Sequence, residues 1–156
     1  PLALNLTLLA SAILAIALAV LSAIDVATMR LPNMLTVPLV AAGLAYVAWS
    51  DPVLLQWRAI SAVAGFVIFW LTAEAYRWAR GRMGLGMGDA KLLAASGAWL
   101  GIENLASVVL IAAVLGLAFA MAAKLLGWAM TLGSRIPFGP FLALGTWWVW
   151  LYGAAG

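Results

Sequence analysis

Six apolar stretches separated by short polar connections make up most of this chain: residues 6–24, 35–49, 54–76, 92–102, 105–126 and 138–152. With a mean hydropathy of +1.14 and only 8% charged residues, the chain has too little polar surface to cover a water-soluble domain. The three longest stretches approach the roughly 20 apolar residues that a membrane-spanning helix needs, and the other three are shorter. We therefore expect an all-α, polytopic membrane protein. A single membrane-embedded domain over residues 1–156 would form a bundle of about six transmembrane helices.

The positively charged side chains gather in the connections on one side of the predicted membrane. Of the eight Lys and Arg residues, all except Arg58 lie in or beside the first, third and fifth connections between apolar stretches, counted from the N-terminus. Under the positive-inside rule this side is cytoplasmic, which leaves both termini on the non-cytoplasmic side. Asp25 and Asp89 then lie at the cytoplasmic boundary, whereas Asp51 and Glu103 lie at the opposite one. The basic side chains are expected to contact anionic membrane lipids.

Asp25 and Asp89 are the candidate catalytic residues. A charged side chain at the edge of an apolar segment is energetically costly, and such residues often mark a functional site. The chain has no cysteine and no histidine, which excludes a Cys/His or Ser/His nucleophile and a histidine zinc site. If the two carboxylates converge, they cannot both ionise comfortably and would share one proton. One could take a proton from an attacking water while the other stabilises the tetrahedral oxygen. This is the chemistry of an aspartyl protease.

Three glycines alternate with other residues just before the second aspartate, at Gly84, Gly86 and Gly88. In an extended stretch they would present one side without side chains, where the backbone of a substrate peptide could lie. Alternatively, the glycines end one helix and permit a turn, and Asp89 caps a helix that starts near Ala90. The spacing alone leaves both interpretations open.

Three blocks of sequence, in order along nearly the whole chain, resemble the motifs of the type IV prepilin peptidases. They are Ile24-Asp25 with Arg30-Leu31-Pro32-Asn33, then Gly86-Met87-Gly88-Asp89-Ala90-Lys91-Leu92, and finally Ile136-Pro137-Phe138-Gly139-Pro140-Phe141-Leu142-Ala143-Leu144-Gly145. By this resemblance Asp25 and Asp89 match the catalytic aspartates. It implies removal of the short basic leader of type IV prepilins, or of the pilin-like subunits (pseudopilins) of type II secretion systems. The enzyme is then expected in the bacterial inner membrane, with its active site facing the cytoplasm.

Residues within these blocks are the candidate substrate-binding groups: Gly86, Gly88, Lys91, Pro137, Phe138, Gly139 and Pro140. Prolines near a helix start are routine, but the resemblance favours a site role for the segment 137–140. Lys91 could pair with Asp89, contact the substrate, or extend to the lipid headgroups, which is the interpretation we favour. A prepilin or pseudopilin and membrane lipids are the expected partners. Neither a nucleic acid, a metal nor a cofactor is expected.

Bifunctional members of that family carry an extra cytoplasmic domain, usually with paired CxxC metal motifs, that methylates the new pilin N-terminus from S-adenosylmethionine. This chain has no cysteine and no soluble insertion between its apolar stretches. We therefore expect peptidase activity without methyltransferase activity.

Two other functions fit parts of the pattern. An ion- or proton-translocating membrane protein could use Asp25 and Asp89 as relay groups, although relay carboxylates should follow a path through the bilayer instead of sharing one boundary. A Ser/Lys protease could use Lys91 with Ser96, but five residues along a helix place two side chains about 140° apart.

Two further patterns concern packing. The cluster Trp147, Trp148, Trp150 and Tyr152 predicts an aromatic belt at the membrane interface. The spacing of Gly97 and Gly101 suits close contact between helices.

Overall fold

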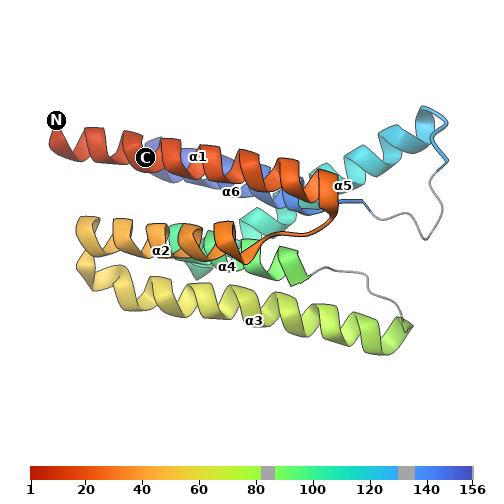
Figure 1. The fold of residues 1–156 in the computed structure, drawn as a ribbon, viewed down its shortest axis with the longest axis horizontal. Coiled ribbons are helices and arrows are strands. Elements are labelled where there is room, and N and C mark those ends of the chain that lie inside the picture. The colour runs from red at the N-terminus through yellow and green to blue at the C-terminus, as the bar shows by residue number, and fades with distance from the viewer. Residues whose placement is uncertain (82–86, 130–135, 156) are drawn as a thin grey trace.

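The computed structural model describes residues 1–81, 87–129 and 136–155, and within these ranges the chain is helical, without strands (Figure 1). The helices are α1 (Leu2–Thr28), α2 (Asn33–Ser50), α3 (Leu55–Arg80), α4 (Met87–Leu100), α5 (Ile102–Leu125) and α6 (Gly139–Ala155), with a 3-10 turn, η1 (Pro52–Leu54), ahead of α3. Each predicted apolar stretch coincides with one of these helices, and the prediction of an all-α polytopic membrane protein is confirmed.

Four helical stretches are long and apolar enough to cross a membrane: α1, α2, the continuous stretch Pro52–Arg80, and α5. Helix α4 has 14 residues, and at 1.5 Å per residue it is only about 21 Å long. Helix α6, with 17 residues, is also short. The bundle therefore combines long spanning helices with two shorter ones.

Helix α4 is the centre of the bundle. Ten of its 14 residues are buried, because it packs against α2, α3, α5 and α6. An apolar helix enclosed in this way needs no lipid-facing stripe, and its length is not set by the thickness of the bilayer. Since its neighbours are longer, both ends of α4 lie inside the bundle and short of the tips of α3 (Figure 1).

Small residues bring the backbones of α3 and α4 close together. A Cβ atom built on Gly65 of α3 would lie 2.9 Å from the carbonyl oxygen of Leu93, and one built on Gly97 of α4 would overlap the carbonyl oxygen of Ser61. Such contacts are the usual way in which helices associate in lipid. The packing role predicted for Gly97 is confirmed.

A single residue, Gly101, with a φ of 87°, separates α4 from α5. The polar groups at this turn are satisfied by α3. The guanidinium of Arg58 donates to the Trp99 carbonyl at 2.9 Å, and the Ile102 N–H donates to the Ser61 hydroxyl at 2.9 Å. Helix ends otherwise leave such groups without partners. Gly101 thus serves the turn and not the contact between helix faces.

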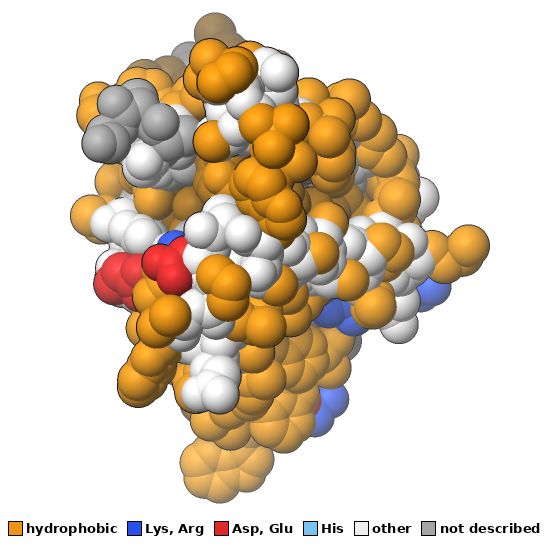
Figure 2. Space-filling view, turned by 90° about the vertical axis from the view of Figure 1, so that its left-hand side faces the viewer, with side chains coloured by type: hydrophobic (Ala, Val, Ile, Leu, Met, Phe, Trp, Pro, Cys, Tyr) orange, Lys and Arg blue, Asp and Glu red, His pale blue; other side chains and the backbone are white. Residues whose placement is uncertain are grey.

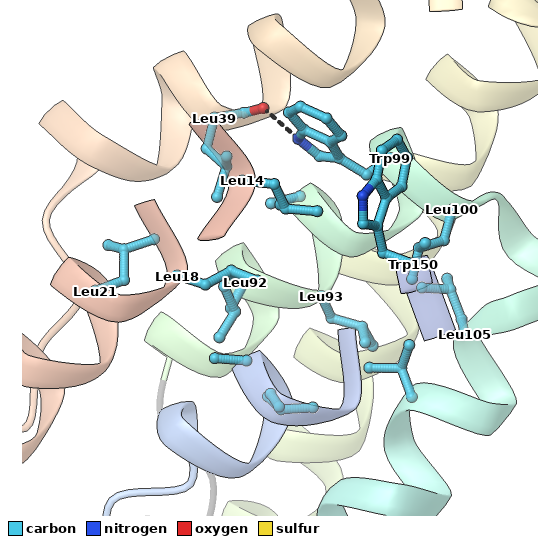
Figure 3. Close-up of a cluster of buried hydrophobic side chains, with 14 of the residues drawn as sticks. Leu14, Leu18, Leu21, Leu39, Leu92, Leu93, Trp99, Leu100, Leu105 and Trp150 are labelled. Atoms are coloured by element: carbon cyan, nitrogen blue, oxygen red, sulfur yellow. Dashed lines mark hydrogen bonds between the residues drawn. The ribbon is translucent and has the colours of Figure 1, made fainter. Parts of the chain in front are cut away.

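Three aromatic rings pack together near the C-terminal end of α4: Tyr46, Trp99 and Trp150 have ring centroids 5.4–6.1 Å apart. Figure 3 shows Trp99 beside Trp150, above the buried leucines of α1 and α4. Trp150 is only 7% exposed, so its assignment to an interfacial belt is wrong. Trp148 and Tyr152, which are exposed, agree with the belt.

The two ends of the bundle differ in charge. Both chain termini lie at one end, and the α1–α2 connection and the C-terminal ends of α3 and α5 lie at the other (Figure 1). Arg77, Arg80 and Lys124 occupy the last turns of α3 and α5, whereas Arg58 lies near the start of α3, at the end that holds the termini. The structure thus reproduces the segregation of charge on which the predicted orientation depends. Which end faces the cytoplasm stays a prediction.

Candidate active site

Asp25 lies in the last turn of α1, which continues past the predicted edge at residue 24 and ends at Thr28. Its side chain is only 6% exposed. One carboxylate oxygen, Oδ2, accepts a hydrogen bond from the backbone N–H of Gly139 at 2.9 Å. The two residues are 114 positions apart in the chain, so this bond joins the end of α1 to the start of α6.

Gly139 can make this bond because it is the first residue of α6. The first N–H groups of a helix have no partner within it, and a carboxylate is a favourable partner at this position. A Cβ atom built on Gly139 would overlap Oδ2 and lie 2.9 Å from the Cγ atom of Asp25. Glycine is therefore the residue that allows so close an approach. The structure places Gly139, predicted to bind substrate, directly on a candidate catalytic carboxylate.

The neighbours of Gly139 hold the start of α6 in place. Phe138 is half-buried and packs against Phe141, with ring centroids 6.3 Å apart, and its carbonyl accepts the N–H of Phe141 at 3.1 Å. Pro140 occupies the second position of α6, where the missing N–H of proline costs nothing. Pro137 is half-buried just before the helix. Pro137, Phe138 and Pro140 thus flank Gly139, whose N–H binds Asp25.

Asp89 is the third residue of α4 and is 8% exposed. An acidic residue in the first turn is favourable because the unpaired N–H groups there carry partial positive charge. Helix α4 thus begins before Ala90, earlier than the capping interpretation requires. Lys91 follows on the same helix and is partly exposed.

Gly88 lies inside α4, so the interpretation in which it belongs to an extended stretch does not hold for this glycine. Gly88 packs against Leu31, since a Cβ atom built on Gly88 would lie 3.1 Å from two carbon atoms of the Leu31 side chain. Gly84 and Gly86, which belong to the same predicted stretch, lie outside the described residues. Leu31, a neighbour of the site, was not predicted from the sequence, although it belongs to the first of the blocks that resemble the family's motifs, Arg30-Leu31-Pro32-Asn33.

Helix α6 packs against both α1 and α4, the two helices that carry the candidate catalytic residues. Asp25 and Asp89 lie at the same end of the bundle, whereas Asp51 and Glu103 belong to the connections toward the other end (Figure 1). Both carboxylates are buried at the end where Arg77 and Arg80 lie. The arrangement provides two acids for general acid–base chemistry near one boundary of the bundle.

Ser96, the nucleophile of the Ser/Lys alternative, is fully buried. Its hydroxyl hydrogen-bonds to the Leu92 carbonyl at 3.0 Å and to the Thr146 hydroxyl at 2.7 Å. A hydroxyl held in the core in this way cannot reach a substrate. The structure therefore disfavours serine chemistry.

A family model described as the type IV leader peptidase family matches residues 12–121, a range that contains Asp25 and Asp89. The chain belongs to the type IV leader peptidase family. Proteins named prepilin leader peptidase/N-methyltransferase are similar to this chain. The protein from Burkholderia pseudomallei is 47% identical over 83% of this chain and 41% of its own length. That from Aeromonas salmonicida is 39% identical over 93% and 50%. That from Dickeya chrysanthemi is 40% identical over 80% and 44%.

The chain thus spans about half the length, or less, of the curated relatives that it matches. No solved structure matches it.

Proposed function

We propose that this chain is an intramembrane aspartyl endopeptidase that removes the short leader peptide from type IV prepilins or pseudopilins, at the cytoplasmic face of the bacterial inner membrane. The observation that carries the proposal is the burial of Asp25 and Asp89 at one end of a membrane bundle, with Asp25 bound to the start of α6. Membership of the type IV leader peptidase family supports the reaction.

The two carboxylates divide the chemistry between them. One accepts a proton from a water molecule, which attacks the carbonyl carbon of the scissile peptide bond. The other, protonated, donates a hydrogen bond to the oxygen of the tetrahedral intermediate, and a proton then passes to the leaving amine as the C–N bond breaks. The Gly139 N–H fixes the orientation of the Asp25 carboxylate. Positioned groups of this kind avoid the cost of ordering during the reaction.

The position of Asp25 and Asp89, the proposed catalytic dyad, suits a substrate that itself crosses the membrane. Asp25 lies in the last turn of α1 and Asp89 in the first turn of α4. An apolar substrate helix can remain in lipid while the peptide at its boundary reaches these residues. Pro137, Phe138 and Pro140 flank the partner of Asp25 and are the proposed contacts for that peptide, together with Lys91.

The basic residues at this end have a different role. Arg77 and Arg80 in the last turn of α3 would not attract the basic leader of a prepilin. Anionic headgroups of the inner membrane are the fitting partners for such residues. We therefore assign them to lipid contact and to orientation in the membrane.

The translocator alternative is not favoured. Relay carboxylates should follow a path across the membrane. In the described part of the chain, the buried acidic residues are Asp25 and Asp89 alone, and both lie at one end. The interior beside α4 is formed by leucines such as Leu14, Leu18 and Leu93.

The proposal is tested by reconstituting the chain in liposomes with a prepilin that carries its leader. Asp25→Asn and Asp89→Asn, made separately, are each expected to slow leader removal by about 10²–10⁴-fold, the usual contribution of a catalytic acid or base. Glu103→Gln, which neutralises an exposed acid toward the other end, is the matched control and should cleave at the normal rate. Leader removal that persists in either aspartate variant would rule out the dyad. Proton flux measured with a trapped pH-sensitive dye tests the translocator alternative in the same vesicles.

A further inference from the structure

A cavity of about 810 Å³ opens at the end of the bundle opposite the two buried aspartates. It exists because α4 is short. Trp99 and Leu100 at the end of α4 and Asn104 at the start of α5 line it, together with residues of α1, α2, α3 and α6. Its volume is within the roughly 300–1,000 Å³ typical of sites for small ligands. The proposed peptidase chemistry makes no use of it.

Two side chains of opposite charge line this cavity, Asp51 and Arg58. They do not pair with each other, since the ion pair found among the described residues is Arg77–Glu74. Asp51 accepts a hydrogen bond from the Val53 N–H at 3.3 Å through Oδ1. Arg58 donates one hydrogen bond, from Nη1 to the Trp99 carbonyl, and a guanidinium has five N–H donors. Each charge therefore retains capacity for a ligand group of the opposite sign.

The setting of these charges is amphipathic. Figure 2 looks onto this end of the bundle and shows acidic side chains beside a basic one on a mostly hydrophobic face. The hydroxyl-bearing residues Thr7, Ser50 and Ser107 line the cavity, and so do the aromatic residues Tyr46 and Trp148. Aromatic rings with one polar edge favour the depth at which lipid headgroups meet the acyl chains. The cavity therefore lies where a phospholipid, and not a soluble metabolite, is the abundant ligand.

We propose that this cavity binds the headgroup of a zwitterionic phospholipid of the phosphatidylethanolamine class, with its phosphate at Arg58 and its primary ammonium at Asp51. An anionic lipid such as phosphatidylglycerol would satisfy Arg58 but would leave Asp51 without a cation. A choline headgroup carries a cation without N–H donors, so it would make no hydrogen bond with the carboxylate. The pairing of both signs in one cavity thus selects a headgroup that carries a phosphate and an ammonium.

Native mass spectrometry of the chain released from liposomes made of equal parts phosphatidylethanolamine and phosphatidylglycerol tests this proposal. The native chain should retain phosphatidylethanolamine about tenfold more than phosphatidylglycerol, the ratio expected from one charge-assisted hydrogen bond. Asp51→Asn preserves an oxygen to accept the Val53 N–H and removes the charge, so the ratio should fall to near one. Arg58→Gln removes the phosphate partner and should lower retention of both lipids.

A matched control separates these effects from a general change of surface charge. Glu103→Gln neutralises an acid outside the cavity lining and should retain the two lipids in the same ratio as the native chain does. Since Arg58 also caps α4, Arg58→Lys tests the case in which Arg58→Gln fails to fold, and should retain both lipids at an intermediate level. Equal retention of the two lipids by the native chain would overturn the proposal. An unchanged ratio in Asp51→Asn would do so too, and would leave the cavity to water or to another polypeptide segment.

Discussion

Gly139 approaches Asp25 so closely that a single methyl group at this position would strike the carboxylate. A Cβ atom there would overlap Oδ2 and lie 2.9 Å from Cγ. Ordinary van der Waals contact begins at 3.4 Å. In Gly139→Ala the carboxylate must therefore move away from α6 by about 0.5 Å (3.4 − 2.9) or more. The 2.9 Å hydrogen bond from the Gly139 N–H must lengthen with it.

The expected fall in kcat depends on how far a catalytic group can be displaced before the reaction slows. Reacting groups must be held within about 0.5 Å of their productive positions, and a displacement of about 1 Å costs roughly 10²-fold in rate. We therefore expect kcat for leader removal to fall by a factor of roughly 10 to 10² in Gly139→Ala, equivalent to about 1.4–2.7 kcal/mol. KM should change little, since the substitution adds no group to the surface that the substrate contacts.

The assay is leader removal from a purified prepilin by reconstituted enzyme, with kcat and KM measured separately and thermal unfolding measured on the same samples. Gly116→Ala in α5 is the control, because the added methyl would meet the nearest ring atoms of Phe138 and Phe141 at an ordinary 3.6 Å. It should cleave at close to the normal rate. A kcat for Gly139→Ala equal to that of the control would refute the positioning role, and so would a loss of activity explained wholly by a loss of folded protein.

Three other substitutions or assays test separate parts of the structure. Gly97→Ala should lower the unfolding temperature, because its methyl would overlap the Ser61 carbonyl and overpacking costs about 1–3 kcal/mol. Gly153→Ala, which meets nothing within 4 Å, is its control, and equal unfolding temperatures in the two variants would contradict the close packing of α3 and α4. Ser96→Ala should preserve leader removal to within about twofold, as expected away from a functional site; a loss as large as that of Asp25→Asn would indicate serine chemistry. Incubation of this chain with S-adenosylmethionine should add no methyl group to the mature pilin, and a methylated N-terminus found by mass spectrometry would contradict that expectation.

Local properties of the sequence were sufficient to predict the class of the protein and the positions of its helices. Hydropathy and breaker residues act over a few neighbouring positions, and the described helix ends follow them: α3 ends directly before Gly81, which has a φ of 65°, and α2 begins directly after Pro32. The distribution of basic residues also predicted that Asp25 and Asp89 share one end of the bundle, and the structure agrees, since α1 ends and α4 begins toward the same end (Figure 1). Helix α4 was placed less well, since its first turn includes Gly88 and Asp89.

The environment of the site could not be predicted in the same way. In water, an apolar stripe along a helix reveals its buried face, but lipid is as apolar as the protein interior. On α1, Leu8 is 60% exposed and Leu14 is 1% exposed, and nothing in their chemistry distinguishes them. The burial of Trp150 was missed for the same reason, because an aromatic residue near a helix end suits the membrane interface and the core equally well.

The sequence by itself thus determined a multi-helix membrane protein with two acidic residues at one end, because length, hydropathy and charge act locally and additively along the chain. Only the tertiary structure decided that Gly139 binds Asp25, that Leu31 covers Gly88, and that a cavity lies beyond the end of α4. These contacts depend on which helices pack together. In a chain that is apolar on nearly every face, that choice depends on backbone approach at glycines and on a few hydrogen bonds between residues far apart in sequence.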